Sequence, residues 1–157
     1  MQKPIYFDYA ATTPVHSAVL NAMLPYFTEE FGNAGSNQHY YGWVAEEAIQ
    51  KSRAQIAQYF NLPASSIIFT SGATESNNLA IQGFLSGKKP GHIITSSIEH
   101  KAVLAVCKHM ESLGWSVTYL NPTENGSIDV EDVKAAIQSN TVLISLMLVN
   151  NELGTIT

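Results

Sequence analysis

Phe69-Thr70-Ser71-Gly72-Ala73-Thr74-Glu75-Ser76-Asn77-Asn78 is the stretch that best indicates the fold, and it lies between apolar runs at 67–69 and 79–81. This order predicts a strand, a turn of small residues and then a helix. Backbone N–H groups at such a turn are unpaired and converge at the positive end of the helix, so a phosphate can bind there. The hydroxyls of Ser71, Thr74 and Ser76 add donors. The alternative is that Ser71 or Thr74 is simply an N-cap residue.

The same turn excludes the common nucleotide motifs. It lacks the lysine of a Walker loop and the three glycines of a dinucleotide fingerprint. A phosphate-bearing cofactor other than a nucleotide is therefore favoured over a generic nucleotide binder.

Composition narrows the class of protein. The 157 residues are 45% hydrophobic and only 13% charged, about half the usual charged fraction, which predicts a large interior or a surface buried against another polypeptide. The net charge is −5 and no basic cluster exceeds Lys88-Lys89, so a nucleic-acid partner is not expected. No apolar run approaches the ~20 residues of a membrane span. A lone cysteine, Cys107, forms no internal disulfide and fits a cytoplasmic protein.

Periodicity along the chain predicts an α/β fold. Strands are expected at 92–95, 115–120 and 141–149, with helices at 99–113 and after Asp129 between them. Alternation of this kind is typical of a parallel, doubly wound sheet. The nine apolar residues of 141–149 predict a strand buried on both faces. Because no helix follows it in this sequence, we expect an exposed apolar surface or self-association.

Polar residues follow each expected strand, where ligands gather in a doubly wound sheet. They lie at 71–74, 96–100, 121–122 and 150–152. His100 could stack on a cofactor ring or relay protons, or it could merely lie near a helix N-terminus. The amides of Asn150 and Asn151 could donate to a ligand oxygen, or they could belong to an asparagine-rich turn. Cys107, on an apolar helix face, is interpreted as a small buried hydrophobe, and no zinc-ligand spacing is present.

Five blocks of sequence carry a family resemblance. They include Tyr6-Phe7-Asp8-Tyr9-Ala10-Ala11-Thr12-Thr13-Pro14, Glu99-His100-Lys101-Ala102-Val103 and Val149-Asn150-Asn151-Glu152-Leu153-Gly154, together with 31–33 and 69–78. In this order they resemble the N-terminal part of a cysteine desulfurase, a class V, fold-type I enzyme that uses pyridoxal 5′-phosphate.

The resemblance implies a fold and a domain division. It implies part of the three-layer, mostly parallel sheet of the fold-type I pyridoxal-phosphate transferase large domain. Residues 1–14 would form an N-terminal arm and residues 15–157 the first half of the large domain. The C-terminal half and the small domain are expected to be absent from this chain.

Site residues are also implied by the resemblance. Ala73 and Thr74 match the phosphate-binding pair, and His100 matches the histidine that stacks on the pyridine ring and assists proton transfer. Asn151 matches the asparagine that contacts the phenolic oxygen of the cofactor. Two further residues, Asn33 and His39, lie in the loop that borders the substrate. The family usually has proline after Gly-Asn, and here Ala34-Gly35 stands instead.

The family reaction converts L-cysteine to L-alanine and leaves a persulfide sulfur for iron–sulfur cluster or thiolation pathways. The resemblance implies a homodimer, or a complementary C-terminal half, and a sulfur-acceptor protein. It places the Schiff-base lysine and the nucleophilic cysteine outside these 157 residues, so activity of the chain alone is not expected. Two alternatives stay open: another class V enzyme such as a selenocysteine lyase, and a noncatalytic interaction module.

Overall fold

The computed structural model describes residues 4–157, which form two compact units. The first unit extends to Phe69, and the second is Thr70–Thr157. The expected division at residue 14 remains a prediction.

The first unit is helical. Its elements are α1 (Ser17–Met23), α2 (Pro25–Thr28), α3 (Tyr40–Tyr59) and the 3-10 helix η1 (Ala64–Ser66). Pro25 separates α1 from α2, as its missing N–H predicts. The cap of α1 is His16, whose Nδ1 accepts from the Ala18 N–H at 3.3 Å. Thr13, which precedes Pro14, is not the N-cap of this helix.

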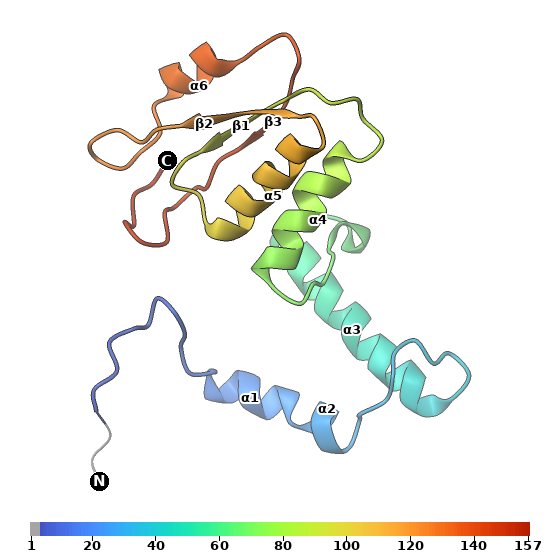
Figure 1. Ribbon diagram of the computed structural model, residues 1–157. Helices are drawn as coiled ribbons and strands as arrows, with labels where there is room; N and C mark the ends of the chain where they lie inside the picture. The colour runs from blue at the N-terminus through green and yellow to red at the C-terminus, as the bar shows by residue number, and fades with distance from the viewer. Residues whose placement is uncertain (1–3) are drawn as a thin grey trace. The chain divides into compact units, whose positions relative to one another are not determined.

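The second unit contains the predicted parallel sheet (Figure 1). Strands β1 (His92–Ser96), β2 (Ser116–Leu120) and β3 (Thr141–Ser145) are arranged in the order β2-β1-β3, and both pairings are parallel. Helices α4 (Ala73–Leu85) and α5 (Lys101–Ser112) lie on one face and α6 (Val130–Ala136) on the other. The α/β class with a parallel sheet is thus confirmed.

Two apolar clusters hold these layers together. Ile93 packs with α4, α5 and Trp115 on one face of β1, and Ile94 packs with Leu120 and Ile128 on the other. Cys107 belongs to the first cluster and is fully buried, as expected. Burial, with smaller contributions from nearby Glu99 and Glu111, raises the pKa of its thiol to about 11. A thiol of that kind is a packing residue and a poor nucleophile.

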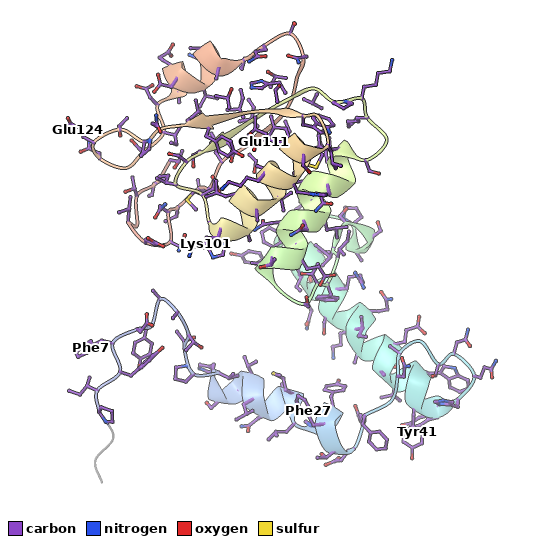
Figure 2. All side chains as sticks on the ribbon, in the orientation of Figure 1. Phe7, Phe27, Tyr41, Lys101, Glu111 and Glu124 are labelled. Carbon is purple, nitrogen blue, oxygen red and sulfur yellow. The ribbon has the colours of Figure 1, made fainter. Side chains whose placement is uncertain are left out.

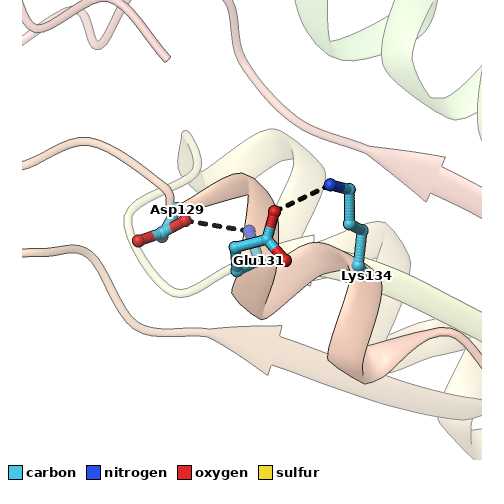
Figure 3. Close-up of polar contacts among 3 residues, drawn as sticks. All are labelled: Asp129, Glu131 and Lys134. Carbon is cyan, nitrogen blue, oxygen red and sulfur yellow. Dashed lines mark hydrogen bonds and ion pairs between the residues drawn. The ribbon is translucent and has the colours of Figure 1, made fainter.

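The short helix α6 begins directly after Asp129, as expected, and Asp129 caps it (Figure 3). The Asp129 carboxylate accepts from the Glu131 N–H at 2.8 Å and satisfies one of the free donors of the first turn. Glu131 and Lys134 pair at 2.7 Å on the exposed face of the helix.

The predicted strand at 141–149 is wrong in length and burial. β3 ends at Ser145, and its residues are only partly buried, because it lies at the edge of the described sheet. The strand buried along its whole length is β1, which has a neighbour on each side and helices over both faces. An apolar run alone did not distinguish the central strand from the edge strand.

The expected strand at 67–69 is also wrong. Ile67 is extended, but no ladder is formed there within the described residues. Its carbonyl accepts from the Arg53 guanidinium, which also stacks over the Phe69 ring at 4.9 Å from its centroid. No helix in residues 4–157 has the length and apolar character needed to cross a membrane.

Candidate functional site

Helix α4 begins with free backbone donors. Its N-cap is Gly72, which has no side chain to satisfy the first turn. The N–H groups of Ala73 and Thr74 therefore make no hydrogen bond within the described chain. A Cβ placed on Gly72 would meet nothing within 4 Å, so the space in front of the turn is open. These features fit an anion such as a phosphate.

Near this turn, the side chains of Ser71 and Glu75 are bonded to each other, whereas the hydroxyl of Thr74 is free among the described residues. Glu75 Oε2 accepts from the Ser71 N–H at 2.7 Å and from the Ser71 hydroxyl at 2.6 Å, and these bonds lower the pKa of the Glu75 carboxyl. Ser71 is thus neither a free donor nor the N-cap. The Thr74 hydroxyl is exposed and makes no hydrogen bond among the described residues, where only the Thr74 carbonyl is bound, so the hydroxyl remains available.

His100 is the N-cap of α5. Its Nδ1 accepts from the Ala102 N–H at 3.1 Å, so the neutral ring carries its hydrogen on Nε2. The ring is exposed, and Nε2 makes no hydrogen bond with the described residues. His100 therefore both caps a helix and presents a free nitrogen.

A cavity of about 620 Å³ brings His100 and Asn151 together. Its walls are the turn at 97–101 with Leu104 and the turn at 150–153. Ala73 and Thr74 do not line it. Helices α4 and α5 nevertheless pack side by side and begin at the same end of the unit (Figure 1). The turn before α4 and the cavity at the start of α5 therefore both lie at the N-terminal ends of these two neighbouring helices.

Asn150 and Asn151 have different roles. Asn150 is buried, and its Oδ1 accepts from the N–H groups of Glu152 and Leu153, both at 2.9 Å. Its Nδ2 donates to the Ile98 carbonyl at 3.1 Å. Asn150 thus builds the turn, as the alternative interpretation proposed, whereas Asn151 is exposed on that turn.

Glu99 is a site residue that the sequence reasoning missed. It is 7% exposed, and its Oε1 accepts from the Met147 N–H at 2.6 Å. Burial raises the pKa of its carboxyl, although the bonds from Met147 and Ser96 act in the opposite direction. The available signal was an acidic residue between Ile98 and His100, but its partner is 48 residues away.

The predicted substrate-loop residues belong to the first unit. Asn33 Oδ1 accepts from the Gly35 N–H at 2.9 Å, and His39 is the N-cap of α3, accepting from the Gly42 N–H at 3.3 Å. Asn33 therefore closes the turn in which the family usually has proline. A second, largely apolar cavity of about 550 Å³ lies in this unit, and neither residue lines it.

The lysines and the metal-ligating side chains bear on which cofactor the site could hold. Among the described lysines, Lys101 alone lines the cavity of His100, at the start of α5 (Figure 2). No cluster of metal-ligating side chains occurs among residues 4–157.

Comparison with known proteins identifies the class. The profile of the family "Aminotransferase class-V" matches residues 5–157. The chain belongs to the class V aminotransferase family, whose chemistry implies pyridoxal phosphate.

Individual relatives are more specific. The chain is 53% identical to "Cysteine desulfurase IscS" of Neisseria gonorrhoeae over 158 residues, covering 99% of this chain and 39% of that protein. It is 54% identical to the protein of the same name from Rickettsia bellii, covering 98% and 38%. The chain thus spans about two fifths of the length of these relatives, consistent with the expected N-terminal part. The resemblance to cysteine desulfurases is confirmed.

Solved structures agree. The structure titled "SspA in complex with cysteine" superposes with a TM-score of 0.89 at 49% identity, covering 96% of this chain and 44% of that one. A "NIFS-LIKE PROTEIN" gives a TM-score of 0.91 at 36% identity, covering 97% and 42%. The fold-type I architecture expected from the sequence is thereby supported.

Proposed function

We propose that this chain forms the phosphate- and ring-binding part of a pyridoxal-phosphate-dependent cysteine desulfurase. The observation that carries the proposal is the cavity shared by His100 and Asn151, on the same side as the open first turn of α4. Family membership and the names of the relatives support cysteine as the substrate.

Each residue then has a definite task. The N–H groups of Ala73 and Thr74 and the Thr74 hydroxyl hold the phosphate, because they are free in the chain and point to an open turn. The flat ring of His100 stacks on the pyridine, and its free Nε2 can hold or release a proton. The Asn151 amide donates to the phenolic oxygen. The cofactor, when bound, delocalises the negative charge that develops on the substrate.

The remaining expectations extend this proposal. L-cysteine is the substrate, L-alanine the product, and the sulfur leaves as a persulfide to an acceptor protein in the cytoplasm. Asn33 and His39 border the substrate. A homodimer or a complementary C-terminal half supplies the other groups that the reaction needs.

Exposed aromatic side chains support the need for a further polypeptide. Phe7 is 88% exposed and Phe27 is 67% exposed, and both carry large apolar rings (Figure 2). Apolar groups this exposed favour association with another protein surface.

Two variants test the binding roles. In titrations with inorganic phosphate and pyridoxine 5′-phosphate, Thr74→Ala should weaken both ligands by about tenfold, as the loss of one hydrogen bond to an anion predicts. His100→Ala should weaken only the ring-bearing ligand, by about two- to tenfold, because stacking needs the ring. His109→Ala, on the last turn of α5, is the matched control and should change neither. Equal loss of both ligands in His100→Ala would contradict stacking.

Covalent capture of the cofactor by this chain alone is not expected. After incubation with pyridoxal phosphate and borohydride reduction, peptide mapping should find scattered, substoichiometric labelling. The physical reason is that Lys101, the described lysine at the cavity, is exposed and lacks the desolvation that activates a lysine amine. One stoichiometric pyridoxyl-lysine at Lys101, absent in Lys101→Arg, would show that the chain anchors the cofactor itself.

A further inference from the structure

Two hydrogen bonds connect the segment before His100 with the segment before Asn151. The Glu99 carboxylate, on the first segment, accepts from the Met147 N–H of the second at 2.6 Å. The Asn150 amide, on the second segment, donates to the Ile98 carbonyl of the first at 3.1 Å. Each segment thus provides one side chain that binds the backbone of the other.

Both side chains are shielded from water. Glu99 is 7% exposed and Asn150 is 5% exposed. Asn150 is fixed further by the Glu152 and Leu153 N–H groups, so its amide plane cannot turn without breaking the turn that carries Asn151. Water cannot easily replace a buried bond, so loss of either side chain leaves a backbone group unpaired.

We propose that Glu99 and Asn150 form a reciprocal clamp that fixes His100 and Asn151 relative to each other at the shared cavity. They are positioning residues for the ring of the ligand, and this role rests on the proposed function. Ala73 and Thr74, which hold the phosphate on α4, lie outside the clamp. The clamp therefore controls ring binding separately from phosphate binding.

The chemistry of Glu99 favours a role in positioning the two segments over a role in stabilising the fold. The Met147 N–H needs one acceptor, which a neutral side chain would supply with less cost of desolvation. A carboxylate instead gives a short, charge-assisted bond with a narrow geometry. The desolvation cost of burying this charge raises the pKa of the Glu99 carboxyl.

The first arm of the test needs no ligand. Amide hydrogen exchange of Met147 in the 157-residue chain should be slow in the unaltered chain and at least about tenfold faster in Glu99→Ala, as loss of one buried hydrogen bond predicts. Glu99→Gln, which keeps an oxygen acceptor, should restore most of the protection. Glu124→Gln removes an equivalent charge from an exposed turn and is the matched control. Unchanged exchange at Met147 in Glu99→Ala would overturn the clamp.

The second arm measures positioning. Glu99→Ala and Asn150→Ala should each weaken pyridoxine 5′-phosphate by about tenfold. Inorganic phosphate should bind as before, and Glu99→Gln should recover most ring affinity. A residue needed only for folding would reduce both ligands together, so parallel losses, or no loss, would overturn the positioning role.

The two arms separate the clamp from the proposed function. If the unaltered chain binds phosphate but gains nothing from the pyridoxine ring, the ring-binding function fails and the positioning role is overturned with it. The Met147 exchange rate would still decide whether the two segments are clamped. If Glu99→Ala does not fold, the ring-to-phosphate affinity ratio of Glu99→Gln and Asn150→Ala decides the positioning role.

Discussion

Ile94→Ala is expected to lower the free energy of unfolding by about 2–5 kcal/mol, the usual cost of emptying a packed isoleucine site. Ile94 has no exposed surface and packs with Leu120 and Ile128 between the sheet and α6. Its neighbours belong to different strands and loops, so they cannot all move in to fill the space. The loss should be largest in the second unit, which carries the cavity.

The same substitution one strand away is the matched control. Ile144 is the register partner of Ile94 on β3 and is 43% exposed. Ile144→Ala should therefore cost about 1 kcal/mol or less. Urea unfolding of both variants at several protein concentrations provides the measurement. Equal losses would mean that β3 is covered by another copy of the chain, as expected from the apolar run 141–149.

The order of strands and helices was predictable because each element carries its own periodicity. Ser116–Leu120 and Thr141–Ser145 lie within the expected runs, and His92–Ser96 extends one residue beyond the expected 92–95. An element that depends on a distant partner does not carry such a local pattern. Ile67 has an extended backbone, as its apolar neighbourhood predicts, but its carbonyl is bound by Arg53 and no strand lies beside it. The extended backbone conformation could be predicted from local sequence, whereas the absence of a paired strand could not.

The candidate site shows the same division. His100 and Asn151 were predictable as a pair because both follow strands that end at one edge of the sheet, and the cavity unites them. Glu99 could not be assigned, since its partner Met147 is joined to it only by the fold. Gly72, not Ser71 or Thr74, caps α4, because the Glu75 carboxylate already binds Ser71. The identity of the N-cap residue thus depended on the hydrogen bonds between Glu75 and Ser71.

Glu99→Ala is expected to lower the free energy of unfolding at neutral pH by about 1–3 kcal/mol, because the Met147 N–H would be left without its acceptor. Glu99→Gln keeps an acceptor and removes the buried charge, so it should cost much less or raise the stability. Thermal and urea unfolding of the two variants, beside Glu124→Gln, measure the difference.

The pH dependence separates the charge from the hydrogen bond. Burial raises the folded-state pKa of Glu99 above its ordinary value of 4.5, so just above pH 4.5 the folded chain holds a proton that the unfolded chain has released. The unaltered chain should then lose stability relative to Glu99→Gln as pH rises through this range, and the difference should level off once Glu99 is ionised in both states. Glu124→Gln should show no such trend. A relative stability that instead increases with pH would mean that the bonds from Met147 and Ser96 outweigh desolvation, and that the carboxylate at this site stabilises the fold.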